Sequence, residues 1–238
     1  MTTSPLPAIP LPARTFRIDP RHALIASAVC WIGFAAIVAM VQTGRTGAID
    51  SAGLLFWRSG NDLRPGGPPW LLEGVRDMTA LGGVLLRNLF AIAALVALLF
   101  LRLRREAVLL AGTIGGGWIV DSLIKALVGR ARPQIVPHLT EAAGLSFPSG
   151  HSFNSAVVYL AIALAFAAIS PRQSVRVTLV ACATVLVVLI GVSRVWLGVH
   201  FPSDVAAGWL GGAGWTFLAS AALHRPAKVV AEVTSSRT

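Results

Sequence analysis

Residues 177–204 read VTLVACATVLVVLIGVSRVWLGVHFPSD, an apolar run that ends in a cluster of polar residues. The run over 177–193 approaches the roughly 20 apolar residues that a helix needs to cross a membrane. Five further runs of this kind occur in the chain, at about 23–42, 81–101, 107–127, 153–170 and 204–223. We therefore predict an all-α fold, a polytopic membrane helical bundle with six transmembrane helices.

The composition is typical of a membrane protein. Apolar residues make up 55% of the 238 and charged residues 13%, about half the charged share of an ordinary soluble domain. The mean hydropathy is +0.73. We predict one six-helix membrane domain over 23–223, between a disordered cytosolic N-terminal tail (1–22) and a cytosolic C-terminal tail (224–238). Cys30 and Cys182 fall inside predicted spans, so neither indicates a disulfide or a metal site.

The formal net charge of +10 follows the predicted topology. Basic residues gather in the two tails and in the second and fourth connections between spans, namely Arg14, Arg17, Arg21, Arg102, Arg104, Arg105, Arg172, Arg176, Arg225, Lys228 and Arg237. With six spans these regions share one side of the membrane, and the positive-inside rule makes that side cytoplasmic. The excess charge then reflects orientation and contact with anionic lipid. We predict no nucleic-acid partner.

Three short polar clusters stand at the ends of the predicted spans. They read Lys125-x6-Arg132-Pro133, Pro148-Ser149-Gly150-His151 and Ser193-Arg194-x5-His200-x3-Asp204. The first follows the third span, the second opens the fourth, and the third joins the fifth to the sixth. Because successive spans alternate in direction, all three clusters are expected on one face. The charge pattern makes that face external.

These residue types can hold a phosphate. Arg132 and Arg194 offer planar, bidentate clamps for phosphate oxygens, and Lys125 adds a point charge. Ser149, just before an apolar run, predicts a helix N-cap. Backbone N–H groups and the helix dipole would then face the anion.

The remaining polar residues can attack the phosphorus. His200 and Asp204 are four residues apart, and Pro202 between them suits the first turn of a helix. A carboxylate at this spacing can hold one imidazole nitrogen and leave the other as a nucleophile. His151 is then available to protonate the departing oxygen.

The triple pattern resembles that of the type 2 phosphatidic acid phosphatase superfamily, membrane lipid phosphatases related to vanadate-dependent haloperoxidases. The resemblance covers Lys125 to Asp204 with the flanking helices, and every position of the family's pattern is filled. It implies a core helical bundle, hydrolysis without a metal or another cofactor, and a phosphohistidine intermediate. It implies that His200 is the nucleophile, oriented by Asp204, and that His151 is the general acid and then the base. Its phosphate-binding positions correspond to Lys125, Arg132, Ser149, Gly150 and Arg194.

The resemblance predicts a lipid phosphatase, and the charge pattern places its site on the outer face of the cytoplasmic membrane. Undecaprenyl diphosphate, phosphatidate and phosphatidylglycerophosphate all fit such a pocket, and an outer-face site favours the first. Two alternatives stay open. One is a phosphotransferase, in which an acceptor hydroxyl replaces water at the phosphohistidine. The other is a transporter that only binds lipid phosphate; charges near one face and the His200–Asp204 pair favour catalysis over it. The oligomeric state also stays open.

Two charged features outside the clusters carry structural hypotheses. Arg87 and Asp121 each lie six residues from the external end of a predicted span. At a rise of 1.5 Å per residue, both are expected about 9 Å below that end. Equal depth suggests an ion pair, since an unpaired charge there is costly. The alternative is that Asp121 pairs with Lys125, its i+4 neighbour. Arg130 is interpreted as an ordinary arginine that reaches from a span end to lipid headgroups.

Small residues and one long loop complete the expectations. Gly112 with Gly116, and Gly208 with Gly212, have the GxxxG spacing that permits close helix packing. The external loop over 43–80 contains apolar residues at helical spacing, namely Trp70, Leu71, Val75 and Met78. They predict an amphipathic segment lying on the membrane surface. It would either wall the lipid entrance or simply pack at the interface.

Overall fold

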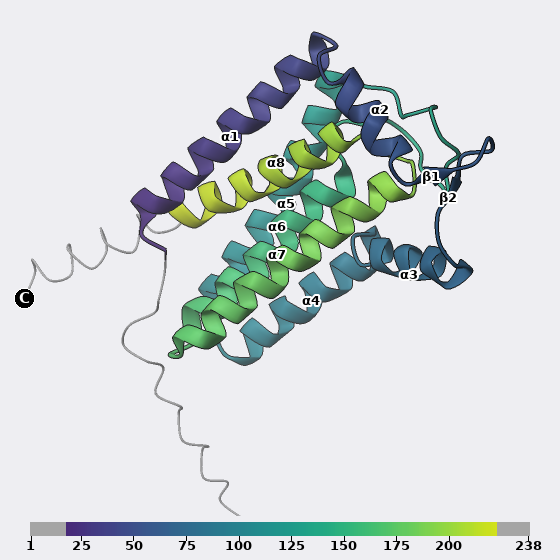
Figure 1. Cartoon of the computed structure of the whole chain (residues 1–238). Helices are drawn as coiled ribbons and strands as arrows, with labels where there is room; N and C mark the ends of the chain where they lie inside the picture. The colour runs from purple at the N-terminus through teal and green to yellow at the C-terminus, as the bar shows by residue number, and fades with distance from the viewer. Residues whose placement is uncertain (1–17, 223–238) are drawn as a thin grey trace, which may run out of the picture.

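The computed structural model describes residues 18–222, and nearly all its regular structure is helical (Figure 1). Six long helices form the bundle: α1 (Pro20–Gln42), α4 (Val84–Phe100), α5 (Arg104–Val128), α6 (Gly150–Ile169), α7 (Gln173–Trp196) and α8 (Pro202–Ala222). Each coincides with one predicted apolar run, and their ends differ by no more than four residues. The helical class of the prediction is confirmed.

Not all six helices meet the requirements of a membrane span. By length and apolar content, α1, α5, α6 and α7 could each cross a membrane. A fifth candidate combines α3 (Pro69–Ala80) with α4, which follow one another across a bend of 47°. Within the described residues α8 is not among the candidates. Four spans, or five with the bent pair, are therefore supported, and six transmembrane helices remain a prediction.

The core forms around α6, which packs against α5, α7 and α8. Glycines on α8 let it approach α6 closely. A Cβ atom at Gly208 would lie 2.7 Å from Ser152 Cβ, and one at Gly212 would lie 2.3 Å from the Phe153 carbonyl oxygen. Close packing through these two glycines is confirmed.

The two glycines of the other predicted pair, on α5, have different surroundings. A Cβ at Gly116 would lie 2.5 Å from the Trp215 ring of α8, so this glycine does allow a close approach. Around Gly112 the described residues place no atom within 4 Å of such a Cβ, so the packing prediction is wrong there. GxxxG spacing identified the pair, but only one member faces a neighbour.

The loop over 43–80 folds against one end of the bundle. It contains α2 (Gly47–Leu55), a small antiparallel hairpin of β1 (Arg58–Ser59) and β2 (Arg64–Pro65), and α3. An amphipathic helix forms where the sequence predicts one. Leu71 and Val75 of α3 pack against a cluster that includes Trp196, while Trp70 is 68% exposed. Its contact with a membrane surface remains a prediction.

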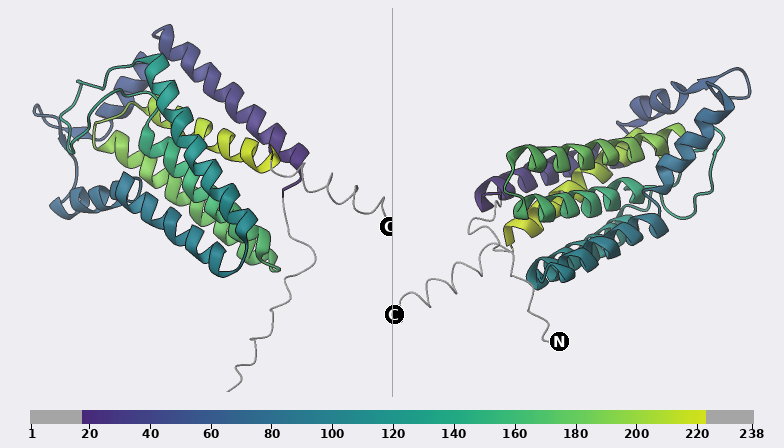
Figure 2. Two further views of the ribbon diagram at one scale, coloured as in Figure 1. Left: turned by 180° about the vertical axis from the view of Figure 1, so that it is seen from behind. Right: turned by 90° about the horizontal axis from the view of Figure 1, so that it is seen from below.

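The described chain ends meet at the opposite end of the bundle from this loop (Figure 2). Helix α1 begins at Pro20, inside the predicted tail, and the Asp19 carboxylate accepts a hydrogen bond from Arg21 N at 2.8 Å. The predicted tails, 1–22 and 224–238, otherwise lie outside the described residues.

Candidate active site

The three polar clusters meet at the end of the bundle that carries α2 and α3. Helix α5 ends at Val128, and Gly129 follows it with φ 65°, turning the chain into the 129–149 loop. That loop returns to the start of α6, where Lys125 Nζ donates a hydrogen bond to the Pro148 carbonyl oxygen. Arg132 Nη1 lies 3.0 Å from His200 Nε2. The clusters therefore share one end, as alternation of the spans predicts.

His200 lies between α7 and α8 and is 2% exposed. Its Nδ1 is 3.5 Å from Asp204 Oδ2 and 3.4 Å from Ser146 Oγ. At its other nitrogen, Arg132 Nη1 can only donate, so Nε2 is the acceptor and the proton of the neutral ring is assigned to Nδ1. Burial lowers the pKa of His200 to about 4, although the hydrogen bond that the ring donates to Asp204 opposes this shift. The ring is therefore neutral at pH 7, with its basic nitrogen turned towards Arg132.

Asp204, on the first turn of α8, is fully buried, and its two oxygens have different partners. Oδ2 faces His200 and accepts hydrogen bonds from Ser146 Oγ and from Phe201 N, the latter at 3.0 Å. Oδ1 accepts from Arg130 Nη1 at 2.6 Å. The carboxylate therefore cannot turn without breaking several bonds. Ser146 lies outside the three sequence clusters, and the sequence analysis missed it.

Arg132 is held by main-chain carbonyl groups. Its Nε and Nη2 donate to Gly144 O and Ala143 O at 3.1 and 2.8 Å, and Nη1 also donates to Val199 O at 2.9 Å. Burial lowers the pKa of Arg132, with Asp204 opposing the shift. An arginine side chain nonetheless stays protonated in proteins. A fixed cation thus stands beside the imidazole of His200.

Two further cations approach the same place. Arg194 is 4% exposed, and its Nη1 donates to Thr79 Oγ1 of α3 at 2.9 Å. Among the described residues its buried Nε has no hydrogen-bond partner. Lys125 is partly exposed, and its Nζ lies 3.3 Å from Asp121 Oδ1. A buried guanidinium with an unused donor fits a site for an anion.

The start of α6 adds backbone donors. Ser149 is the N-cap, as predicted, and its Oγ accepts from Ser152 N at 3.4 Å and from Ser152 Oγ at 3.0 Å. The next N–H groups, those of Gly150 and His151, have no acceptor within the helix. Within the described residues the His151 ring makes no hydrogen bond, and it lies close enough to Arg194 and His200 to interact electrostatically with both. The arrangement suits an anion at a helix N-terminus.

Arg130 differs from its sequence interpretation. Its side chain is 17% exposed and lies 2.7 Å from Asp50 Oδ2 and 2.6 Å from Asp204 Oδ1. Its guanidinium carbon also lies 4.0 Å from the centre of the Phe201 ring. The interpretation as an arginine reaching headgroups is therefore wrong. The signal that could have corrected it is Gly129, because a chain that leaves its helix there no longer runs along the lipid-facing surface.

Among the described residues, Asp121 pairs with Lys125 and not with Arg87, as the alternative hypothesis predicts. Asp121 contacts Lys125, and its Oδ2 also accepts from Asn154 Nδ2 at 2.9 Å. Arg87 Nη1 donates instead to Gly82 O at 3.1 Å, at the bend between α3 and α4. Within residues 18–222 no ion pair joins Arg87 to Asp121. Arg87 therefore holds the bend by its hydrogen bond and interacts with Asp121 only by longer-range electrostatic attraction.

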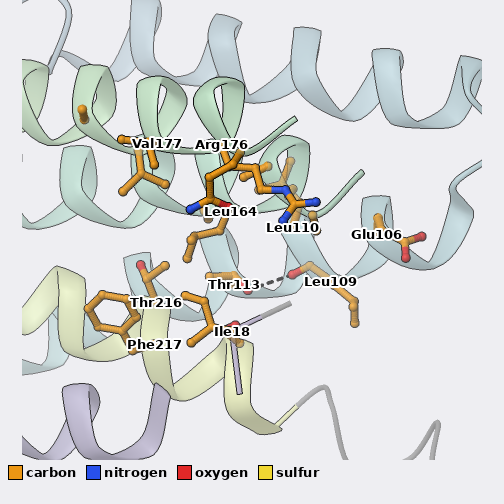
Figure 3. A pocket seen from close by; sticks show the side chains of 18 residues that line it. Ile18, Glu106, Leu109, Leu110, Thr113, Leu164, Arg176, Val177, Thr216 and Phe217 are labelled. Carbon is orange, nitrogen blue, oxygen red and sulfur yellow. Dashed lines mark hydrogen bonds between the residues drawn. The ribbon is translucent and has the colours of Figure 1, made fainter. Parts of the chain in front are cut away.

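A cavity of about 540 Å³ lies elsewhere, between α5, α6, α7 and α8 (Figure 3). Its walls are mostly apolar, with Leu110 and Phe217 among them and Glu106 and Arg176 at the polar part. None of the residues of the three clusters lines it. The cavity is therefore separate from the polar clusters.

Comparison with known proteins gives consistent matches. A family model described as PAP2 superfamily matches residues 105–227, which include all three clusters. Phosphatidylglycerophosphatase B of Bacillus subtilis is 37% identical over 144 residues, covering 59% of this chain and 70% of that protein. Lipid A 1-phosphatase of Rhizobium etli is 38% identical over 115 residues, but the match spans only 45% of its length. The crystal structure of a transmembrane PAP2-type phosphatidylglycerolphosphate phosphatase from Bacillus subtilis superposes with a TM-score of 0.72 at 29% identity, over 81% of this chain and 93% of that one.

Proposed function

This chain belongs to the PAP2 superfamily, and from that premise we propose that it is a membrane enzyme that hydrolyses a phosphomonoester or diphosphate of a lipid. The relatives named above are phosphatases of lipids, and the apolar helices suit a membrane protein. We further propose six spans, with both tails cytoplasmic and the polar clusters at the external face. The charge distribution supports this orientation.

One observation carries the proposal: a neutral, buried imidazole meets a group of fixed cations. His200 Nδ1 faces Asp204, and its Nε2 faces Arg132. A neutral imidazole with one nitrogen held by a carboxylate is a nucleophile at the other. The unused donors of Arg194 and of the α6 N-terminus supply sites for the phosphate oxygens. The nucleophile and the anion site thus share one pocket.

The first chemical step forms a bond between His200 and phosphorus. Phosphate oxygens accept hydrogen bonds from Arg132, Arg194 and Lys125, and Arg132 turns from Nε2 to the phosphate. The Nε2 lone pair attacks phosphorus, the bond from phosphorus to the lipid oxygen breaks, and His151 transfers a proton to that oxygen. The phosphohistidine keeps its Nδ1 proton, and Asp204 stabilises the positive ring.

The second step returns the enzyme to its starting state. Neutral His151 takes a proton from a water molecule, whose oxygen attacks phosphorus. The bond from phosphorus to Nε2 breaks, and the electron pair returns to His200. Orthophosphate leaves, and His151 is again protonated for the next cycle. No group other than these side chains is required to move a proton.

Phosphatidylglycerophosphate heads the list of substrates to test, because a relative matched over 70% of its length is named phosphatidylglycerophosphatase B. Undecaprenyl diphosphate and phosphatidate complete the panel. In each, the hydrocarbon chain would stay in the bilayer while the phosphate enters the cationic pocket.

The test is release of orthophosphate from each lipid by the purified full chain in detergent micelles with a chelator present. We expect release from at least one lipid, its loss in His200→Ala, and its retention in His22→Ala at the far end of α1. Activity unchanged by His200→Ala would refute the proposal. Adding glycerol separates hydrolysis from phosphotransfer, since a transferase would form a glycerol phosphate in place of orthophosphate.

A further inference from the structure

Arg130 lies between two buried carboxylates. Nη1 donates to Asp204 Oδ1 at 2.6 Å and to Ser203 Oγ at 2.8 Å, while Nη2 donates to Asp50 Oδ2 at 2.7 Å. The flat guanidinium also covers the Phe201 ring. Asp50 and Asp204 are 1% and 0% exposed. A fork of N–H groups in this geometry fixes the orientation of both partners.

Asp50 connects this pair of contacts to the external loop. It belongs to α2, and it holds the start of α8 by accepting from Ser203 N at 3.0 Å and from Ser203 Oγ at 2.8 Å. Ser203 is the residue directly before Asp204. The short helix α2 is therefore anchored, through one carboxylate, to the turn that carries the proposed catalytic aspartate.

We propose that Arg130 and Asp50 are positioning residues for Asp204, which make the external loop part of the catalytic apparatus. This rests on the proposed function of the His200–Asp204 pair. By holding Oδ1, Arg130 leaves Oδ2 directed at His200 Nδ1. Asp50 supplies the counter-charge that keeps Arg130 in place.

The charges explain why both residues are needed. Without Arg130, two buried carboxylates would remain close to Ser203 with no cation between them. Like charges at a buried site favour protonation of one of them. A protonated or rotated Asp204 no longer holds the N–H group at Nδ1 by a charged hydrogen bond, and the nucleophilic tautomer of His200 is no longer favoured.

Arg130 is distinguished by its contacts from Arg194, one of the two proposed phosphate-binding arginines. Its two terminal nitrogens are committed to Asp50, Ser203 and Asp204. Arg194, by contrast, keeps a buried Nε without a partner among the described residues. Loss of Arg130 should therefore slow the chemical step and leave substrate affinity unchanged.

The experiment compares Arg130→Gln and Asp50→Asn with Arg76→Gln in the purified full chain. Arg76 is the matched control, because it anchors α3 of the same loop through two bonds to Leu139 O, at 3.1 and 2.7 Å, and contacts neither residue of the catalytic pair. We expect kcat to fall by about 10- to 100-fold in the first two variants, the usual effect of removing a supporting shell. KM should stay within about twofold, and Arg76→Gln should keep wild-type kcat.

Two further measurements decide the outcome. Inorganic phosphate should raise the melting temperature of each variant as it does for the wild type, which shows that the anion pocket is folded. Arg130→Lys should recover only part of kcat, since an ammonium cannot reproduce the fork. If Arg130→Gln does not fold, Asp50→Asn, which keeps the size of the side chain, carries the same expectation.

A kcat that is unchanged in Arg130→Gln and Asp50→Asn, while His200→Ala is inactive, overturns the positioning role and leaves the enzyme function intact. A raised KM at constant kcat would make Arg130 a phosphate ligand instead, and loss of the phosphate-induced shift would make its role structural. Full activity of His200→Ala would remove the proposed function itself.

Discussion

Replacing Gly208 by alanine should damage both stability and activity. A Cβ atom there would lie 2.7 Å from Ser152 Cβ, 2.9 Å from Ser149 O and 3.0 Å from Phe153 N. The first distance is roughly 0.7 Å below the 3.4 Å at which ordinary contact begins. The obstructing atoms belong to the first turn of α6, which also carries His151, so no flexible side chain can move aside. Helices α6 and α8 must separate.

The magnitude follows from that separation. Adding one methyl group to a well-packed core destabilises by about 1–3 kcal/mol. A shift near 1 Å between α6 and α8 would move His151 away from His200, and such a misplacement lowers the rate by about 10²-fold. The assays are thermal unfolding in detergent and initial rates of orthophosphate release.

Gly112→Ala is the matched control for this substitution. It belongs to the other GxxxG pair, yet the described residues leave open space around its Cβ position. Its stability should stay within about 1 kcal/mol of the wild type, because only the helix preference for alanine over glycine changes. The reasoning is wrong if Gly208→Ala has the melting temperature and initial rate of the wild type. It is also wrong if Gly112→Ala lowers both as much as Gly208→Ala does.

The remaining predictions concern the polar site. Ser146→Ala removes the hydroxyl that donates to Asp204 Oδ2. We expect kcat to fall by about tenfold, which corresponds to the loss of about 1.4 kcal/mol for one hydrogen bond to a charged group. An unchanged kcat would refute this. Arg194→Lys should raise the inhibition constant of inorganic phosphate, since an ammonium lacks the planar fork, and equal inhibition in both proteins would contradict the assignment. Burial lowers the pKa of His200 to about 4 from an ordinary 6.5, so the unfolded chain takes up a proton that the folded chain does not. The stability present above pH 6.5 should therefore be lost progressively as the pH falls to 4. In His200→Gln the melting temperature should fall less over the same range, and parallel curves would show that His200 does not titrate in this way.

The positions of the long helices could be predicted because burial in lipid imposes a simple pattern. Apolar runs of sufficient length mark them, and their ends moved by only a few residues in the structure. The meeting of the three clusters at one end followed from alternation alone. Hydropathy was less decisive for α8, because its glycines pack against α6 and α1. Its tryptophans pack elsewhere, Trp209 against α7 and Trp215 against α5.

The supporting contacts of the site could not be predicted in the same way. Asp50 and Arg130 are 80 residues apart, and neither belongs to a repeated or periodic pattern. Asp50 belongs to none of the three polar clusters. Their pairing depends on how α2 folds onto the bundle, which composition and spacing do not determine. Likewise, spacing cannot show which glycine of a GxxxG pair faces a neighbour.

The hydrogen bond from Arg132 to His200 Nε2 gives the site a form of chemical selectivity. The lone pair that would attack phosphorus is already shared with an N–H group. Only a molecule that offers the guanidinium a better acceptor can release it, and an anionic phosphate does so while a neutral ester or alkyl halide does not. In the proposed mechanism, the substrate itself therefore frees the Nε2 lone pair of His200. Neutral alkylating reagents should leave His200 unmodified in mass spectra of the phosphate-free protein, although the same reagents label the exposed His22.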